Sequence, residues 1–533
     1  MHRILIADSL DPAGLELLRQ SGADVRVVTA EEKPRLAEIL PDYDALVVRS
    51  STQVTADLMR AGKRLKVVGR AGIGVDNVDV AAATELGILV VNAPTANLVS
   101  ATEHTFALLF ALARKIPFAD ASMKEGKWDR KITGLELQGK TIGIIGFGRI
   151  GQKVAARARA FDMQVLAFDP FLDAAAARRL EVELVSLEDL LRQSDVITFH
   201  TPLTDQTRNL LNRESIALMK KGALVINVGR GGVVDEAALL EALESGHLGG
   251  AALDVFSEEP PKDLTLVRHP QVVATPHLGA QTREAQERIS TETADMLLGA
   301  LSGSLSIAAV NLPFRAAGAR VEPYMALGET LGRMASLLLG TAPQRLQVDL
   351  WGIEEAFRVP VTMAALMGVL STFSRDAMVN YVNAERLAEE RNIEVVRSTH
   401  MAAAADYPSL VGVTLSGGGR TVELDGTLLG ERDQRVVRIG GYRLEFRPDG
   451  QLLVVENLDV PGVVGKVGTL LADAGINIAD IHLARTDRPV GPSGEREAMA
   501  VLRLDQELPD ALVDQLCELG VVRSARRVDM TRR

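Results

Sequence analysis

A glycine-rich turn between a buried strand and a helix constrains the fold of this chain more than any other feature. The segment Gly146-Phe-Gly148-Arg-Ile-Gly151 matches the pattern GxGxxG. The apolar residues 141–145 before it predict a strand, residues 149–161 after it predict a helix, and the strand MQVLAFD that follows reaches Asp169. A structural glycine turn is the alternative, but the complete strand–turn–helix–strand context favours a dinucleotide-binding α/β fold.

Each position of this motif predicts a contact with the cofactor. Gly146 permits the tight turn, Gly148 lets the backbone approach a pyrophosphate, and Gly151 allows close contact between helix and strand. The helix N-terminus offers free N–H groups to the phosphates. Asp169 would accept hydrogen bonds from the adenosine ribose hydroxyls and repel a 2′-phosphate, so the sequence predicts NAD rather than NADP.

The order of strand-like and helix-like segments extends this fold over the first 310 or so residues. Runs such as RILIAD and GILVVN are continuously apolar, which is typical of strands covered on both faces of a parallel sheet. We predict an α/β fold with two doubly wound, Rossmann-like parallel-sheet domains, then an α+β intervening domain and a ferredoxin-like βαββαβ domain. The predicted limits are 1–98 with 283–312 for the substrate-binding domain, 99–282 for the NAD-binding domain, 313–450 for the intervening domain and 451–533 for the last domain.

The composition excludes several classes of protein. Lys and Arg number 59 against 70 Asp and Glu, and the net charge of −11 disfavours a nucleic-acid partner. A single cysteine, Cys517, cannot form an intramolecular disulfide, and no Cys/His spacing resembles a metal site. No apolar run approaches the ~20 residues of a membrane span, and the first residues do not resemble a signal peptide. We therefore expect a cytoplasmic protein without a membrane partner or a bound metal.

Three polar segments follow predicted strands of the second domain and would meet at one edge of its sheet. They are NVGRGG (227–232), DVFSEEP (254–260) and TPHLGA (275–280). Ligands in open α/β sheets bind at this edge. Arg230 can fork onto a carboxylate, His277 can exchange a proton near neutral pH, and Glu259 can orient that imidazole and raise its pKa. Taken singly, each is as readily a surface charge, a structural histidine or a polar loop, so the prediction rests on the set.

The motifs GxGxxG, NVGRGGVVDE, ALDVFSEEP and TPHLGAQT together resemble the D-isomer-specific 2-hydroxyacid dehydrogenase family over roughly residues 1–312. The resemblance implies that Arg230, Glu259 and His277 form a catalytic trio. The residues that it implies for NAD are Gly146, Gly148, Arg149, Ile150, Gly151, Asp169, His200, Thr201, Pro202, Val228, Gly229, Arg230, Asp254, His277, Gly279 and Ala280. Those implied for the substrate are Arg49, Ser50, Gly72, Ile73, Gly74, Arg230 and His277.

The same resemblance gives some of these residues a role. Asp254 would hold the nicotinamide amide, the backbone N–H groups of Gly72 and Gly74 would receive the substrate carboxylate, and Arg49 would meet a phosphate. Residues 130 and 131 (Arg-Lys) resemble cations that relatives present near the active site across a dimer. We therefore expect a homo-oligomer, either a dimer or a tetramer.

The long extension after residue 312 narrows the choice within the family. The tail QLLVVENLDVPGVVGKVGTLLADAGINIADIHLAR resembles an ACT domain, a small regulatory module that binds amino acids. A dehydrogenase core, an intervening domain and an ACT domain together resemble the long-form phosphoglycerate dehydrogenases. This resemblance implies NAD-dependent oxidation of 3-phospho-D-glycerate to 3-phosphohydroxypyruvate, the first step of L-serine biosynthesis. It also implies that the intervening domain binds an anion or a second substrate molecule.

The ACT resemblance implies an L-serine effector between paired domains, at Asn457, Asp459 and Asn477. Close relatives tend to carry Tyr or His where this chain has Asn457, so an ACT domain that serves only assembly is the alternative. Two other functions stay open. One is another D-2-hydroxyacid dehydrogenase, such as a glyoxylate or hydroxypyruvate reductase, which the long extension disfavours. The other is an NAD-sensing interaction protein on the same core, which the acidic charge and the ACT-like tail disfavour.

Overall fold

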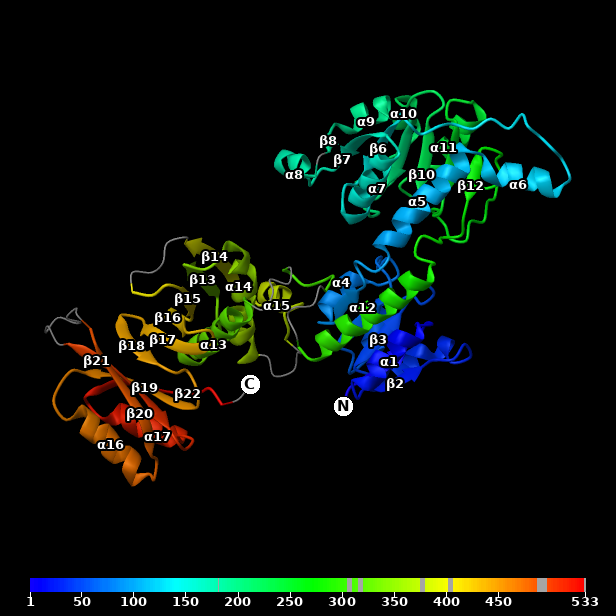
Figure 1. Cartoon of the computed structure of the whole chain (residues 1–533). Helices are drawn as coiled ribbons and strands as arrows, with labels where there is room; N and C mark the ends of the chain where they lie inside the picture. Colours follow the sequence, from blue (N-terminus) through cyan, green and yellow to red (C-terminus); the bar gives the residue numbers. More distant parts are fainter. Residues whose placement is uncertain are drawn as a thin grey trace.

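The computed structural model describes residues 1–180, 182–303, 309–314, 320–373, 379–400, 406–486 and 496–531. They form four sheets in the predicted order: two parallel sheets with helices, a mixed six-stranded sheet and a four-stranded sheet (Figure 1). The predicted fold class is confirmed. The predicted domain limits stay a prediction.

The first sheet is parallel and covered on both faces, as its continuously apolar strands predict. Leu5 and Leu46 pack with α2, α3 and α4 on one face, whereas Ile4 and Val47 pack with α1 and α12 on the other. The strand order is β2-β1-β3-β4-β5. The elements are β1 (Arg3–Ile6), α1 (Pro12–Gln20), β2 (Asp24–Val27), α2 (Leu36–Ile39), β3 (Ala45–Val48), α3 (Ala56–Ala61), β4 (Val67–Arg70), α4 (Val80–Glu85), β5 (Leu89–Asn92) and α12 (Arg283–Leu301).

The second sheet is also parallel, with the order β12-β11-β10-β9-β6-β7-β8. Chain order reverses between β6 and β9. Ligands of such sheets bind beside this point, at the carboxyl ends of the strands. Helices α5 and α7 pack on one face, and α9 to α11 pack on the other. The elements are α5 (Leu98–Ala113), α6 (Ile116–Lys124), β6 (Thr141–Ile145), α7 (Arg149–Ala160), β7 (Gln164–Phe168), α8 (Ala174–Arg179), β8 (Glu183–Leu184), α9 (Leu187–Gln193), β9 (Val196–Phe199), α10 (Arg213–Ala217), β10 (Leu224–Asn227), α11 (Glu236–Glu244), β11 (Gly250–Leu253) and β12 (Val272–Ala274).

Two helices connect these α/β units. α5 leaves the first unit after β5 and runs along the second sheet, and α12 returns the chain to cover the first sheet (Figure 1). The two connections touch where they enter the first unit: Arg288 Nε donates to Ala96 O at 3.0 Å, and Thr95 Oγ1 donates to Glu292 Oε1 at 2.9 Å. The relative position of the two units is therefore tied to these helices.

The last two units share one core. Helices α13 and α14 cover one face of the six-stranded sheet, and residues of the four-stranded sheet such as Val454 and Val501 join the same cluster. The sheet orders are β14-β13-β15-β16-β17-β18 and β20-β21-β19-β22, the second being the antiparallel order of a βαββαβ fold. The elements are α13 (Glu322–Leu339), β13 (Arg345–Trp351), α14 (Arg358–Ser371), α15 (Ala384–Glu390), β14 (Glu394–His400), β15 (Leu410–Gly417), β16 (Arg420–Leu429), β17 (Asp433–Ile439), β18 (Tyr442–Phe446), β19 (Gln451–Leu458), α16 (Val463–Asp473), β20 (Ile478–Arg485), β21 (Glu497–Leu504), α17 (Asp510–Glu518) and β22 (Val522–Asp529).

Two searches of the described residues bear on the expected partners. None of their helices has the length and apolar character that a bilayer crossing requires. Within the same residues, no three His, Cys, Asp or Glu side chains lie together as a metal site would need.

Candidate active site

The residues implied for catalysis lie on three loops at one edge of the second sheet. Arg230 follows β10, Glu259 follows β11 and His277 follows β12. Parallel pairing of β10 with β11 and of β11 with β12 brings the three loops to the same edge. This is the carboxyl edge, where the sequence analysis placed them.

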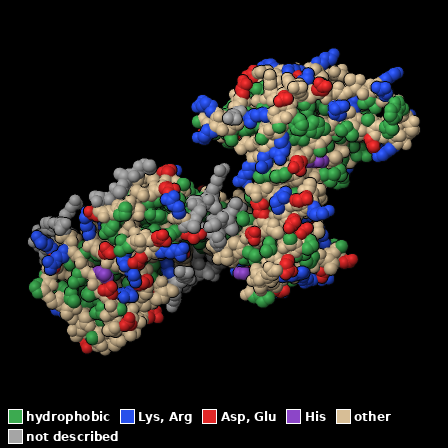
Figure 2. Space-filling model, viewed as in Figure 1, with side chains coloured by type: hydrophobic (Ala, Val, Ile, Leu, Met, Phe, Trp, Pro, Cys, Tyr) green, Lys and Arg blue, Asp and Glu red, His purple; other side chains and the backbone are tan. Residues whose placement is uncertain are grey.

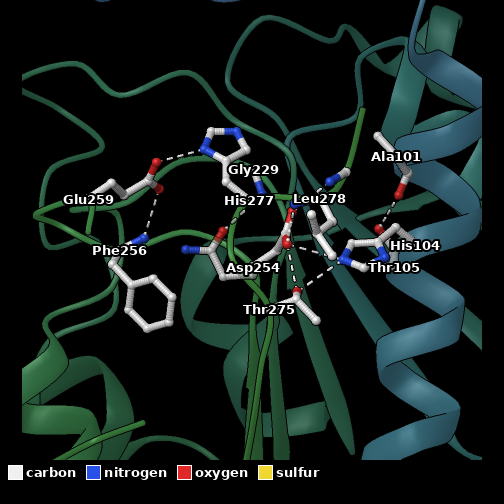
Figure 3. A network of polar contacts seen from close by, with 12 residues as sticks. Ala101, His104, Thr105, Gly229, Asp254, Phe256, Glu259, Thr275, His277 and Leu278 are labelled. Atoms are coloured by element: carbon white, nitrogen blue, oxygen red, sulfur yellow. Dashed lines mark hydrogen bonds and ion pairs between the residues drawn. The ribbon is translucent and has the colours of Figure 1, made fainter. Parts of the chain in front are cut away.

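His277 and Glu259 form a direct pair (Figure 3). His277 Nδ1 lies 2.7 Å from Glu259 Oε2, and the other carboxylate oxygen accepts a hydrogen bond from Phe256 N at 3.1 Å. The side chains of His277 and Glu259 are 49% and 38% exposed. Because Nδ1 faces the carboxylate, Nε2 is the nitrogen left to exchange a proton with a substrate.

This contact shifts both ionisations. The hydrogen bond to Glu259 raises the pKa of His277 above its usual value, although burial and the charge of Arg230 oppose the shift. Burial alone would raise the pKa of Glu259, but the hydrogen bond from His277 holds it below its usual value. The pair therefore stays an imidazolium and a carboxylate up to a higher pH than an isolated histidine would allow.

A buried carboxylate holds the loop that carries His277. Asp254 is fully buried, and its Oδ1 and Oδ2 accept hydrogen bonds from Leu278 N at 2.7 Å and Gly279 N at 2.8 Å. Its backbone oxygen accepts one from His277 N at 2.9 Å. His277 has a φ of +55°, a left-handed conformation that costs free energy in a non-glycine residue. Asp254 thus stabilises the strained backbone at His277.

Arg230 reaches from the second unit to the first. Its Nε lies 3.3 Å from Asp76 Oδ2, and its guanidinium lies so close to Gly74 that a Cβ atom there would come within 2.2 Å of Nη2. Nη1 donates to Gly229 O at 2.8 Å. Asn227, which the sequence analysis gave no role, braces the loop by donating to Arg230 O at 2.9 Å. Arg230 and the predicted substrate loop therefore meet between the two units.

Arg70, the last residue of β4, opens the segment 70–77 that resembles the family's substrate loops. Burial lowers its pKa to about 10, and the positive charges of Arg230 and Arg49 contribute. The guanidinium groups of Arg49, Arg70 and Arg230 thus concentrate positive charge in one region between the units. Figure 2 shows Lys and Arg side chains gathered on the viewed face where the units join.

Arg49 and Ser50 lie on the loop after β3, which a buried aspartate braces. Asp8 accepts hydrogen bonds from Arg49 N at 2.6 Å and from Lys33 Nζ at 2.5 Å. Burial would raise the pKa of Asp8, but these bonds keep it below its usual value. Asn77 donates to Arg49 O at 2.6 Å from the other side. The predicted substrate loop is thus held in place by residues from three separate segments.

The second predicted substrate loop, with Gly72, Ile73 and Gly74, follows β4. Asn92, at the end of β5, donates to Ile73 O at 2.5 Å and fixes the loop to the sheet. Gly72 has a φ of +152°, which L side chains rarely adopt. Its lack of a side chain is therefore required by the backbone there.

The glycines of the cofactor motif divide into two kinds. A Cβ atom would lie 2.7 Å from His200 O at Gly146 and 2.3 Å from Gly146 O at Gly151, so packing requires both glycines. At Gly148, the N-cap of α7, a Cβ atom would meet nothing within 4 Å. Packing therefore does not explain Gly148, whereas close approach of a pyrophosphate to the bare backbone does.

The surroundings of this turn fit NAD. The Asp169 carboxylate accepts hydrogen bonds from Phe147 N at 2.8 Å and Phe171 N at 2.9 Å, which holds it beside the turn. Burial lowers the pKa of His200 to about 4, so its ring is neutral near neutral pH. The buried hydroxyl of Thr201 has no hydrogen-bond partner among the described residues, and a bound nucleotide would supply one.

The other residues implied for NAD lie along the same edge. Gly279 and Val228 are neighbours, since a Cβ atom at Gly279 would lie 3.2 Å from both Val228 Cγ1 and Asp254 Oδ2. The rest lie at the start of α7 or on the loops after β9, β10 and β12: Arg149, Ile150, Pro202, Gly229 and Ala280. Their contacts with NAD stay a prediction.

The residues implied for an effector do not lie close together within one chain. Asn457 pairs with Ala498 on β21, whereas Ile478, next to Asn477, pairs with Leu504. Six residues of β21 separate these points, about 20 Å at ~3.4 Å per residue. Asn457 and Asn477 therefore lie at opposite ends of the sheet.

These residues also have partners of their own. Asp459 Oδ2 lies 3.1 Å from Arg485 Nε, and Asn477 Nδ2 donates to Asp505 Oδ2 at 2.6 Å. Asn457 is buried, and its side-chain amide donates to Leu458 O at 2.7 Å. An effector would have to compete with these contacts.

Comparison with known proteins decides the family. Residues 106–279 match the D-isomer specific 2-hydroxyacid dehydrogenase NAD binding domain, residues 320–440 the D-3-phosphoglycerate dehydrogenase intervening domain, and residues 451–521 the ACT domain. The chain is 40% identical to the D-3-phosphoglycerate dehydrogenase of Bacillus subtilis, over 99% of this chain and 100% of that protein. It is 43% identical to the Mycobacterium tuberculosis enzyme of the same name over 95% of both chains. The chain belongs to the D-3-phosphoglycerate dehydrogenase family.

Membership of this family makes the chain an NAD-dependent oxidoreductase, as the sequence analysis predicts. Solved structures agree. The TT0316 protein from Thermus thermophilus is 38% identical with a TM-score of 0.53, covering 56% of this chain and 97% of that one. A D-lactate dehydrogenase from Aquifex aeolicus, solved with NAD and lactic acid, is 30% identical with a TM-score of 0.51, covering 57% and 96%.

Proposed function

We propose that this D-3-phosphoglycerate dehydrogenase family member oxidises 3-phospho-D-glycerate to 3-phosphohydroxypyruvate with NAD, as the first step of L-serine biosynthesis in the cytoplasm. The observation that carries the proposal is the His277–Glu259 pair, 2.7 Å apart, on the sheet edge that also carries the glycine turn. The names of relatives that span nearly the whole chain support the substrate.

Each member of the catalytic trio has a task in this reaction. NAD held at the glycine turn beside Asp169 would supply the acceptor for the hydride that leaves C2 of the substrate. His277 Nε2 takes the proton of the C2 hydroxyl, and Glu259 keeps the ring oriented and stabilises the imidazolium that forms. Arg230 binds the substrate carboxylate through its fork of donors, which also polarises the adjacent carbonyl in the reverse direction. To do so it exchanges its contact with Asp76 for the substrate.

The charges between the units suit a substrate with two anionic groups. Arg230 and the N–H groups of Gly72 and Gly74 bind the carboxylate, and Arg49 and Arg70 bind the phosphate at the other end. A 2-hydroxy acid without a phosphate would leave Arg49 and Arg70 without a counter-ion. This difference favours phosphoglycerate over lactate or glyoxylate.

The test is NADH formation by the purified chain. Turnover of 3-phosphoglycerate well above that of D-lactate or D-glycerate supports the proposal, and Arg70→Ala should raise KM for 3-phosphoglycerate more than for D-glycerate. Efficient turnover of an unphosphorylated acid with none of 3-phosphoglycerate would instead identify another D-2-hydroxyacid dehydrogenase.

L-serine is the proposed effector, bound between the ACT units of two chains. The opposite placement of Asn477 from Asn457 and Asp459 supports this arrangement, because only a second copy can bring the two ends together. Asp459 would bind the amino group and Asn477 would form amide hydrogen bonds. Serine titration of the activity tests this, with Asp459→Ala as the variant.

The intervening unit is the proposed binding site for an anion or a second substrate molecule. A cavity of about 360 Å³ lies between β17–β18 and the ACT sheet. Its lining includes three arginines and a histidine, against Glu445 and Asp480: Arg435, Arg447, Arg503 and His482. Phosphate and 3-phosphoglycerate titrations by calorimetry, with Arg503→Ala as the variant, test this site.

We infer that the chain forms a homo-oligomer through α6 and the loop after it. This arm extends from the second unit (Figure 1) and exposes Ile116, Met123 and Trp128, the last at 78%. Large apolar side chains gathered on one arm are typical of an interface. Trp128→Glu should lower the mass measured by light scattering, whereas Phe171→Glu, at a similarly exposed ring elsewhere, should not.

A further inference from the structure

A second histidine reaches the catalytic loop from the side opposite to Glu259. His104 lies on α5, and its Nε2 is 3.1 Å from Asp254 Oδ1 and 3.1 Å from Thr275 Oγ1 (Figure 3). Its side chain is 18% exposed, whereas Asp254 is fully buried. Neither the glycine motif nor the catalytic trio accounts for this histidine.

The hydrogen bonds settle which ring nitrogen of His104 carries a hydrogen. Thr275 Oγ1 donates its own hydrogen to Asp254 Oδ1 at 2.6 Å, so toward His104 it can only accept. The carboxylate can also only accept. Both groups face Nε2, so Nε2 carries a hydrogen and donates to both of them. His104 is therefore a donor to the centre of the network, not a proton acceptor there.

His104 helps to hold Asp254, the carboxylate that supports the loop of His277. Asp254 Oδ1 takes three donors, from His104, Thr275 and Leu278 N, and its hydrogen bonds with His104 and Thr275 offset burial and lower its pKa. The two residues after His277 bind this carboxylate through their backbone N–H groups. A change in the position of Asp254 would therefore move His277, which has a strained backbone.

The position of His104 depends in turn on how the two α/β units are placed. α5 begins directly after the first unit and packs against β10, β11 and β12 of the second. The residues just before α5, Thr95 and Ala96, are bound to α12, the other connection. His104 thus lies on an element that connects both units, six residues after the first helical residue, Leu98.

We propose that His104 is a positioning residue for the reaction: it fixes Asp254 and Thr275 and so couples the connecting helix α5 to the orientation of His277. This inference rests on the proposed role of His277 as the proton acceptor.

The experiment compares His104→Ala with His104→Gln, whose amide nitrogen can still donate. Since a misplacement of about 1 Å can cost on the order of 10²-fold in rate, kcat of His104→Ala should fall by about 10- to 100-fold. His104→Gln should recover most of the rate. The acid limb of the kcat/KM profile, set by His277, should shift in His104→Ala and return in His104→Gln.

His247→Ala is the matched control, because His247 Nε2 also binds one group of the same unit, Ile216 O at 3.0 Å, away from the catalytic edge. It should lower the melting temperature without a change in kcat. The proposal is overturned if His104→Ala keeps the wild-type kcat. It is also overturned if the rate and melting temperature fall together as in a folding defect and His104→Gln rescues neither.

The outcome is separable from that of the proposed function. The assay uses whichever 2-hydroxy acid the wild-type enzyme oxidises best, so failure on 3-phosphoglycerate alone would reject the substrate and leave the His104 test intact. A double variant with Thr275→Val completes the test. The two substitutions should be non-additive in kcat if they act through Asp254, and additivity would count against the coupling.

Discussion

The proposed catalytic and effector sites of this chain are built in opposite ways. Parallel strands bring Arg230, Glu259 and His277 to one edge of a single sheet, so one chain contains the whole trio. In the ACT unit the antiparallel register places Asn457 and Asn477 at opposite ends of the sheet. The strands β19 and β20 are both antiparallel to β21 and so run in the same direction, which puts the end of one and the start of the other at opposite ends of the sheet. The proposed catalytic site therefore needs one chain, whereas the proposed effector site needs two.

The largest expected effect tests whether the catalytic site is complete within one chain. His277→Asn should lower kcat by about 10²- to 10⁴-fold, because it removes the general base. The affinity for NADH, measured by fluorescence, should stay close to that of the wild type. Mixed oligomers of variant and wild-type chains should retain activity in proportion to the wild-type chains. A non-proportional loss would show that the site is shared between chains.

The next effect tests the shared effector site. Asp459→Ala or Asn477→Ala should each weaken serine inhibition by about 10- to 100-fold, because each removes a hydrogen bond to a charged or buried group. A mixed dimer of the two variants contains one site in which both residues are wild type. Serine should therefore inhibit the mixed dimer at wild-type concentrations with about half the amplitude. Loss of inhibition in the mixed dimer would place both residues of a site in one chain.

A smaller effect distinguishes the two kinds of glycine in the cofactor motif. Gly148→Ala should raise KM for NAD by about tenfold, or ~1.4 kcal/mol, and leave the melting temperature unchanged. Gly151→Ala should instead lower the stability by about 1–3 kcal/mol, because its Cβ atom would overlap Gly146 O. Thermal melts and NAD titrations of both variants check this. Equal melting temperatures would contradict the packing argument.

The smallest expected effect concerns pH. Glu259 raises the folded-state pKa of His277, so the imidazolium persists to higher pH. Oxidation needs the neutral ring. Its rate should therefore fall as the pH falls through that pKa. Glu259→Gln removes the carboxylate, and the acid limb of the oxidation profile should move to lower pH. The reverse reaction, which needs the imidazolium, should lose rate at a lower pH than in the wild type. Unmoved profiles in both directions would separate Glu259 from the ionisation of His277.

Sequence patterns predicted what depends on local spacing. The strand–turn–helix context predicted the glycine turn with Asp169 beside it, and three strand-end motifs predicted that Arg230, Glu259 and His277 lie at one sheet edge. Patterns missed the residues that act through distant contacts. His104 binds Asp254 across 150 positions, and Asp8 binds Arg49 across 41. A lone histidine on a mostly apolar helix follows no periodic pattern. Its role depends on its contact with Asp254, which lies far later in the chain.

The separation of Asn477 from Asn457 is already implied by the predicted βαββαβ order. Asn457 ends the predicted strand QLLVVEN and Asn477 lies at the start of INIADIHLA, and the strands of a βαβ unit run parallel. The strands β19 and β20, both antiparallel to β21, have this arrangement. The register itself was beyond the sequence, because it requires the paired strand.

The return of the chain through α12 has a consequence for the order in which the molecule is made. The first sheet receives Ile289 and Leu297 on one face only after the whole second unit has been synthesised. The second sheet, in contrast, has all of its strands and helices in one continuous stretch from α5 to β12. On the ribosome, the second unit to be translated should therefore be the first to complete its core. Stalled chains that end before α12 should bind NAD while residues 1–98 remain open to protease.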